Sequence, residues 1–211
     1  TMAEFDVVVI GAGPGGYVSA IRAAQLGAKV AVIERNKIGG TCLTWGWIPT
    51  KALYYSAKAL EAAKHASDFG VNVGEVSFDL EKAVERKDGV VKKLVGGIEQ
   101  LLKGNKVEVI RGDGFVEAAG KVSVKKADGT EELSCKSIII ATGSEPALIP
   151  AFNIDRKNVL TSTEMLDIKK LPASLLVIGG GVMGCEFASM FSSFGSKVII
   201  VELLPTILST E

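Results

Sequence analysis

The sequence predicts an α/β fold in which two βαβ units, one at each end of the chain, are joined by helices and a small antiparallel sheet. The first observation is an internal repeat: FDVVVIGAGPGGYVSAIRAAQLGAKVAVIE at residues 5–34 and LLVIGGGVMGCEFASMFSSFGSKVIIVE at residues 175–202 share one pattern at a constant offset of 168 residues. The second is that each copy reads as an apolar strand, a glycine turn, an apolar-periodic helix closed by Gly, and a second buried strand that ends in Glu. The third is a run of short strands with turn signals between the two copies.

Composition excludes several classes of protein. Lys plus Arg and Asp plus Glu both number 24 in 211 residues, which leaves no net field to attract nucleic acid or an anionic membrane. No apolar run approaches eighteen residues, so we expect no membrane span and a reducing setting, cytoplasmic or in the mitochondrial matrix of a eukaryote. The three cysteines are too scattered for a disulfide framework, and neither they nor the single His65 show metal-ligand spacing.

The elements between the repeats follow from periodicity and turn residues. Residues 48–67 and 79–103 are helical by period, and the segment 106–133 predicts short strands with a hairpin turn at Asp128-Gly129. A buried strand, SIIIATGSEP, then ends in a small-residue turn. We place a domain boundary near Pro150, with one domain at residues 1–150 and the beginning of a second, truncated domain at residues 151–211.

The first repeat has the pattern of a Rossmann-like dinucleotide site. Gly11 permits a tight turn, Gly13 lets backbone approach a pyrophosphate, and Gly16 lets the helix pack on the strand. The helix N-terminus supplies N–H donors and partial positive charge for the phosphates. Glu34, at the end of the second strand, is placed to accept hydrogen bonds from a ribose diol.

The second repeat carries the same groups at Gly179, Gly181, Gly184 and Glu202. A carboxylate at the ribose position repels a 2′-phosphate, so this site is expected to prefer NAD to NADP. Two glycine turns that serve packing alone are the alternative, but packing does not require an acid at the matched position of both copies.

Five motifs in order, GAGPGG, GGTCLxxGxIPTKAL, GDGF, ATGS and GGGxxGxE, give the chain a family resemblance. It resembles the flavin-dependent pyridine nucleotide disulfide oxidoreductases, and among them most closely those of the dihydrolipoamide dehydrogenase type. The resemblance implies that the first unit binds FAD, that the second binds NAD, and that dihydrolipoamide is oxidised through a cysteine pair at the flavin. It also implies a lipoamide-bearing protein as substrate and a homodimeric parent enzyme.

The resemblance further implies roles for individual residues. In the first domain the FAD-binding residues would be Gly11, Gly13, Pro14, Gly16, Glu34, Gly40, Thr41, Lys51, Gly114, Ala141, Thr142 and Gly143. In the second, the NAD-binding residues would be Gly179, Gly181, Gly184 and Glu202. Lys51 would lie near the reactive edge of the flavin, with Glu186 as its carboxylate partner.

The cysteine motif departs from the family pattern. The family carries two cysteines five positions apart, whereas this chain has Cys42 at the position that exchanges with substrate and Trp47 at the position that faces the flavin. A single thiol forms only mixed disulfides or is oxidised without resolution. We therefore expect no disulfide exchange with lipoamide by this chain as it stands. The family's His–Glu pair and dimer module have no match within it.

Two alternatives remain open. A soluble pyridine nucleotide transhydrogenase of the same superfamily resembles the chain in its single cysteine and in a Trp at the place of Trp45, and it needs no disulfide. A redox-inactive domain that binds FAD or another adenine nucleotide is the second alternative, favoured by Trp47 and by the short chain.

Overall fold

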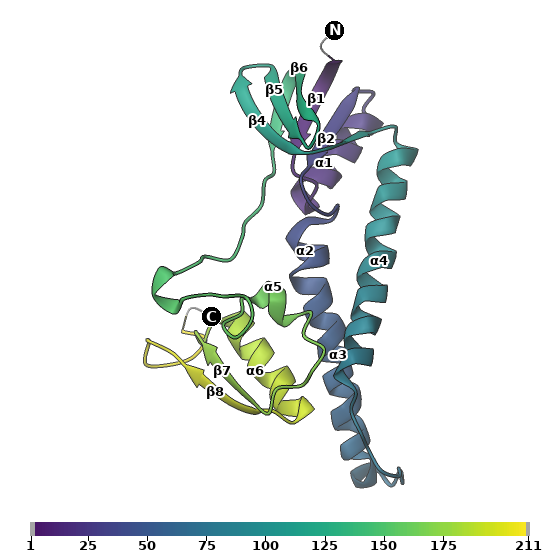
Figure 1. Ribbon diagram of the computed structural model, residues 1–211. Coiled ribbons are helices and arrows are strands. Elements are labelled where there is room, and N and C mark those ends of the chain that lie inside the picture. The colour runs from purple at the N-terminus through teal and green to yellow at the C-terminus, as the bar shows by residue number, and fades with distance from the viewer. Residues whose placement is uncertain (1–2, 210–211) are drawn as a thin grey trace. The chain divides into compact units, whose positions relative to one another are not determined.

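The computed structural model describes residues 3–209 and divides into two compact units, which are taken in turn (Figure 1). The first comprises Thr1–Ile48 and Val90–Ala147, and the second comprises Pro49–Gly89 and Leu148–Glu211. Two long helices, α3 (Trp47–Lys64) and α4 (Leu80–Gly104), contribute residues to both units. The predicted domain boundary near residue 150 stays a prediction.

The first unit is built on one six-stranded sheet. Its order is β3-β2-β1-β6-β5-β4, with β3, β2, β1 and β6 parallel and β6, β5 and β4 antiparallel. The strands are β1 (Ala3–Ile10), β2 (Val30–Glu34), β3 (Glu108–Arg111), β4 (Asp113–Ala118), β5 (Lys121–Lys126) and β6 (Gly129–Ile140). This arrangement confirms the predicted α/β class with a Rossmann-like parallel sheet and a small antiparallel extension.

The centre of this sheet is strand β1. Val8 pairs with Ala31 of β2 on one side and with Ile138 of β6 on the other, so β1 has a strand neighbour along both edges. Val8 is fully buried because both faces of the central strand are covered. Helix α1 (Pro14–Gln25) packs against β1 and β2, as the βαβ pattern predicts.

The hairpin between β5 and β6 is present, but the predicted turn was wrong by one residue. Lys126 pairs with Gly129, so the two-residue turn is Ala127-Asp128. Gly129 begins β6 with φ +144°, a conformation that favours glycine. Gly129 is therefore a strand residue, and its backbone freedom allows the chain to leave the turn.

The second unit holds the second βαβ repeat. Strands β7 (Ser174–Ile178) and β8 (Lys197–Val201) are parallel, and helix α6 (Val182–Phe194) connects them. The remaining short helices of this unit are η1 (Ala66–Phe69), η2 (Pro150–Phe152) and α5 (Ser162–Met165). Its core joins α6 to the second-unit parts of α3 and α4 through Leu53, Leu60, Leu80, Val84, Phe187, Phe191 and other apolar side chains.

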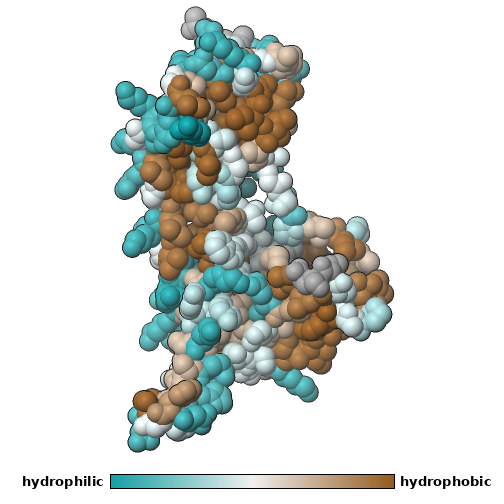
Figure 2. Space-filling model, turned by 180° about the vertical axis from the view of Figure 1, so that it is seen from behind, coloured by the Kyte–Doolittle hydropathy of each residue, from teal (hydrophilic) through white to brown (hydrophobic). Residues whose placement is uncertain are grey.

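The second repeat was expected to have buried strands, and this expectation was wrong for one face of its sheet. Leu176, Ile178, Ile199 and Val201 are each more than half exposed, because α6 covers only the opposite face of β7 and β8. Figure 2 shows apolar side chains gathered at the surface of this unit. The end of β6 is also less buried than predicted: Ile140 is 69% exposed, because β5 pairs only with residues 129–134 of β6.

Candidate functional site

The first glycine turn follows β1 and opens helix α1. Gly11 has φ +100°, and a Cβ there would overlap the carbonyl oxygen of Ala141. A Cβ on Gly16 would in turn overlap the carbonyl oxygen of Gly11. Both glycines are therefore required by close backbone approach within the turn, whatever the turn binds.

Glu34 is held against this turn by both of its carboxylate oxygens. The N–H of Ala12 donates to Oε2 at 2.8 Å, and the N–H of Asn36 donates to Oε1 at 2.7 Å. The residue is only 8% exposed, so these bonds fix the orientation of a nearly buried carboxylate. Each oxygen still has lone-pair capacity for a further donor, such as a ribose hydroxyl.

The second turn reproduces this arrangement at the offset of 168 residues. Gly179 has φ +101°, and the N–H of Gly180 donates to Oε2 of Glu202 at 2.6 Å. The N–H of Leu204 donates to Oε1 at 2.8 Å, so each oxygen of Glu202 has the same backbone partner as its equivalent in Glu34. The hydrogen bonds from Leu204 and Gly180 lower the pKa of Glu202 below its ordinary value.

Neither nucleotide-type helix has a side-chain N-cap. Gly13 caps α1 and Gly181 caps α6, each with extended backbone and no side-chain hydrogen bond to the first turn. Helix α5, by contrast, has a complete capping box in which the side chains of Thr161 and Glu164 bond the backbone reciprocally. In α1 the first residue, Pro14, has no N–H, and the N–H of Gly16 donates to the carbonyl oxygen of Gly13 at 2.9 Å. No side chain caps the start of either helix, and a helix N-terminus of this kind suits an anionic group.

The other predicted FAD-binding residues of the first unit lie around the first turn. Gly40, with φ +59°, lies so close to Gly13 that a Cβ on Gly40 would stand 2.6 Å from the Cα of Gly13. Ala141 continues the sheet, because its N–H donates to the carbonyl oxygen of Ile10 at 2.8 Å. Gly114 lies on β4, where a Cβ would press on the side chains of Ile10 and Ile33. Close packing accounts for glycine at positions 40 and 114.

Cys42 and Trp47 are placed by two successive helices. Cys42 is the third residue of the short helix α2 (Gly40–Thr44) and is partly buried against the apolar core of the first unit. Trp47 begins α3, and its side chain is 61% exposed. The indole fills no core space, so its identity is not dictated by packing within the unit.

Lys51 and Glu186 form an ion pair within the second unit. The Nζ of Lys51, on α3, donates to Oε1 of Glu186, on α6, and both side chains are about one-third exposed. The ammonium also lies 5.7 Å from the ring centroid of Tyr54. The sequence distance between the partners gives no local signal for this contact, whereas the family resemblance predicts it.

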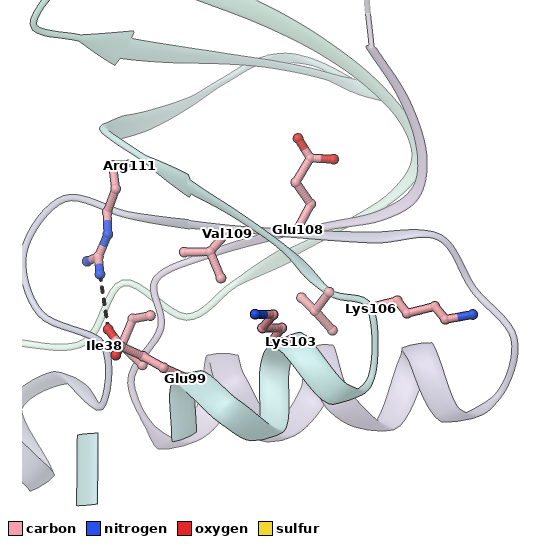
Figure 3. Close-up of a pocket in the computed structure, with 8 residues that line it drawn as sticks. Ile38, Glu99, Lys103, Lys106, Glu108, Val109 and Arg111 are labelled. Carbon is pink, nitrogen blue, oxygen red and sulfur yellow. Dashed lines mark ion pairs between the residues drawn. The ribbon is translucent and has the colours of Figure 1, made fainter. Parts of the chain in front are cut away.

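A surface hollow of about 570 Å³ lies in the first unit beside the edge strand β3 (Figure 3). It is lined by Ile38, Glu99, Lys103, Lys106, Val107, Glu108, Val109 and Arg111. None of these belongs to the predicted site residues. Arg111 pairs with Glu99 across the hollow and also donates to the carbonyl oxygen of Asn36 at 2.6 Å, which braces the loop after β2.

Metal and membrane features are both absent from the described part of the chain. Residues 3–209 contain no group of three or more His, Cys, Asp and Glu side chains that could hold a metal ion. No helix within the same range is long and apolar enough to span a membrane.

Of the other thiols, Cys135 lies on β6, where burial raises its pKa.

Comparison with known families agrees with this geometry. The family described as pyridine nucleotide-disulphide oxidoreductase matches residues 5–211. The chain belongs to this family. The match covers both glycine turns.

Two curated relatives are dihydrolipoyl dehydrogenases. That of Bacillus subtilis (strain 168) is 48% identical over 217 residues, covering 99% of this chain and 46% of the relative. That of Acholeplasma laidlawii is 48% identical over 212 residues, covering 98% of this chain and 62% of the relative. The chain spans about half the length of the curated relatives it matches.

Solved structures show the same fold. The HOCl-induced flavoprotein disulfide reductase RclA from Escherichia coli aligns with a TM-score of 0.83 and 33% identity, over 96% of this chain and 43% of the other. LpdA from Mycobacterium tuberculosis aligns with a TM-score of 0.88 and 26% identity, over 98% of this chain and 46% of the other. The architecture of the chain is therefore that of this oxidoreductase family.

One contact near the first turn was not predicted from the sequence. Arg35 and Glu145 form an ion pair between the loop after β2 and the segment after β6. The two residues stand 110 positions apart in segments without periodicity, so no sequence signal indicates that they meet. The pair lies beside the first glycine turn.

Proposed function

We propose that this chain carries the FAD half-site and the opening of the NAD site of a flavoprotein oxidoreductase of the dihydrolipoamide dehydrogenase type. The observation that carries the proposal is the repeated turn: Glu34 and Glu202 each bind two backbone N–H groups in the same way, beside a helix without a side-chain cap. Relatives about 48% identical over nearly the whole chain bear the name dihydrolipoyl dehydrogenase, which supports this choice within the family.

In the first unit, the proposed role of the chain is to hold FAD. The N-terminus of α1 binds the pyrophosphate after Gly13, and Glu34 accepts the ribose hydroxyls. Pro14 is the first residue of α1, and its ring fixes φ at a helical value. Thr41, Thr142 and Gly143 border the flavin nucleotide, and a Cβ on Gly143 would meet no atom within 4 Å.

In the second unit, we assign NAD to the second turn. The same uncapped helix N-terminus lies at Gly181, and Gly184 packs against the backbone of Gly179. Glu202 is ionised near neutral pH, as an ordinary glutamate is, and its lowered pKa keeps it ionised further into acid, so its carboxylate repels a 2′-phosphate. NAD is therefore the proposed pyridine nucleotide rather than NADP.

The reaction assigned to the whole protein is oxidation of dihydrolipoamide on a lipoamide-bearing protein with reduction of NAD, in a homodimer within a reducing compartment. Bound FAD supplies a carrier for two electrons. Lys51 places a positive charge that Glu186 balances, and Cys42 is the only thiol of the cysteine motif. With Trp47 at the second thiol position, we expect this sequence not to turn over lipoamide.

The test uses a protein extended to the length of the curated relatives and carrying Trp47→Cys. It should form NADH from NAD and dihydrolipoamide, and the same protein with Trp47 should not. If neither protein forms NADH while both hold flavin and fold normally, the assignment to this reaction is incorrect.

Trp47 also favours a second candidate, a pyridine nucleotide transhydrogenase, because hydride transfer between nicotinamides needs no disulfide. Transfer of hydride from NADPH to an NAD analogue by the extended protein with Trp47 would support this candidate. Glu202 argues against it, since its carboxylate disfavours NADPH.

A further inference from the structure

Two loops of the first unit flank the first glycine turn. Residues 35–39 follow β2, and the N–H of Gly39 donates to the carbonyl oxygen of Ala12 at 2.9 Å. Residues 141–147 follow β6, and Ala141 lies directly against the backbone of Gly11. The turn therefore has a loop on either side, and each loop touches it through backbone atoms.

The two loops are also joined to each other. The guanidinium of Arg35 pairs with the carboxylate of Glu145, and the hydroxyl of Thr41, in α2, donates to the carbonyl oxygen of Ser144 at 3.4 Å. These side-chain contacts close a ring that runs from the turn through one loop, across to the other loop and back to the turn. All of its members belong to the first unit.

The two sides of the ring differ in how firmly they are held. Asn36 receives a hydrogen bond from Arg111 and donates one to Glu34, so the loop after β2 is braced from behind. Residues 142–147 are exposed and have no helix or strand structure. Two side-chain contacts join this exposed segment to the other side of the turn: the long 3.4 Å hydrogen bond from Thr41 to Ser144, and the Arg35–Glu145 ion pair to the braced loop.

We propose that Arg35 and Glu145 are positioning residues for the first dinucleotide site: their ion pair holds residues 142–147 beside the glycine turn and slows the release of bound FAD. This inference rests on the proposed assignment of FAD to the first unit. Neither residue needs to contact the dinucleotide, because the pair acts by fixing the loop that borders it. Pre-organised loops lose less conformational entropy when they close over a ligand.

A direct contact between Arg35 and the phosphates of FAD is the competing explanation, and a double-mutant cycle separates the two. If the pair acts as a tie, Arg35→Gln, Glu145→Gln and the double variant should raise the FAD release rate by the same factor, about two- to five-fold for an exposed pair. The exchanged pair Arg35→Glu with Glu145→Arg should restore slow release. If Arg35 binds phosphate directly, Arg35→Gln alone should have the large effect and the exchange should not restore it.

The experiment measures FAD release from the 211-residue chain by flavin fluorescence after rapid dilution. It also measures amide hydrogen exchange of the FAD-free chain over residues 142–147. The double variant Lys121→Gln with Glu132→Gln is the matched control, because it removes an exposed ion pair between β5 and β6 of the same unit. We expect faster exchange in the segment for the Arg35 and Glu145 variants, and wild-type values for the control.

The two readouts distinguish failure of the tie from failure of the FAD assignment. Wild-type release rates together with wild-type amide exchange in Glu145→Gln would overturn the tie while leaving FAD binding intact. A large effect confined to Arg35→Gln would overturn it in favour of direct phosphate binding. A wild-type chain that takes up no FAD would overturn both the assignment and the proposed role of the pair in release.

Discussion

Lys51 and Glu186 stand 135 residues apart in the sequence and form an ion pair between α3 and α6 of the second unit. The contact joins α3, which follows the cysteine motif, to α6, which follows the second glycine turn. Both residues belong to the second unit, so the pair fixes α3 against α6 within that unit, through side chains that are only partly exposed.

Removing either partner of this pair should weaken the second unit slightly. Because both side chains are about one-third exposed, solvent screening limits the expected loss in unfolding free energy to about 0.5 kcal/mol for Glu186→Gln or Lys51→Gln. Urea unfolding of the two single variants and the double variant measures the coupling. Additive losses would show that the pair contributes no interaction energy.

Glu34 should matter far more for FAD than Glu202. Glu34→Gln places an amide N–H₂ where the N–H of Ala12 or Asn36 needs an acceptor, at a site that is 8% exposed. We expect FAD affinity to fall by about ten- to a hundred-fold, as for a lost hydrogen bond at a buried group. Flavin fluorescence titration checks this.

The matched control is Glu202→Gln, which makes the equivalent change in the second turn. It should leave FAD affinity unchanged and weaken discrimination against NADPH. Equal loss of FAD in both variants would contradict the assignment of the two turns.

Replacing Gly16 should destabilise the first unit for steric reasons. A Cβ there overlaps the carbonyl oxygen of Gly11, so Gly16→Ala should cost about 1–3 kcal/mol of unfolding free energy. Gly96→Ala, in α4 of the same unit, meets no atom within 4 Å and should stabilise by about 1 kcal/mol through helix propensity. Thermal unfolding distinguishes the two, and equal shifts would refute the steric account.

Restoring the second thiol should be tolerated and should create a dithiol. Trp47 is 61% exposed, so Trp47→Cys should change stability by less than about 0.5 kcal/mol. Oxidised lipoamide should then be reduced as Cys42 and the new thiol form a disulfide, with the loss of two titratable thiols per chain. Thiol titration after gel filtration measures this, and retention of all thiols would show that the two positions do not meet.

The second turn should lose stability in acid. The pKa of Glu202 is lowered in the folded chain, chiefly by the N–H groups of Leu204 and Gly180, so its contribution is fully present above the unfolded-state pKa. It is lost as the pH falls through the lower, folded-state pKa. Carboxyl resonances followed by NMR should show Glu202 titrating below the ordinary value for a glutamate. Titration at the ordinary value would contradict the hydrogen-bonded geometry.

Much of the fold could be predicted because the sequence repeats one strand–turn–helix–strand pattern, and such patterns depend on neighbouring residues. The offset of 168 residues placed both glycine turns and both acids, and the structure shows matching hydrogen bonds at Glu34 and Glu202. The roles given to these residues stay predictions. The pairing of Lys51 with Glu186 came from the family resemblance, because periodicity does not report contacts between distant helices.

Other features depend on tertiary context that the sequence does not display. An apolar run such as VIIV predicts a strand but not how many of its faces are covered, and in β8 Ile199 and Val201 are exposed. The Arg35–Glu145 pair joins two irregular segments, for which no pattern reports proximity. The β5–β6 turn lies one residue earlier than predicted, because its position follows from the register in which β5 and β6 pair.

The central claim, that the first βαβ unit with its surrounding loops holds FAD, is tested most directly by a visible absorption spectrum. The 211-residue chain is incubated with excess FAD, passed through gel filtration and examined for flavin absorbance in the protein peak. The account predicts that a flavin band co-elutes with the wild-type chain and is weaker for Glu34→Gln. A folded wild-type chain that elutes without flavin would contradict it.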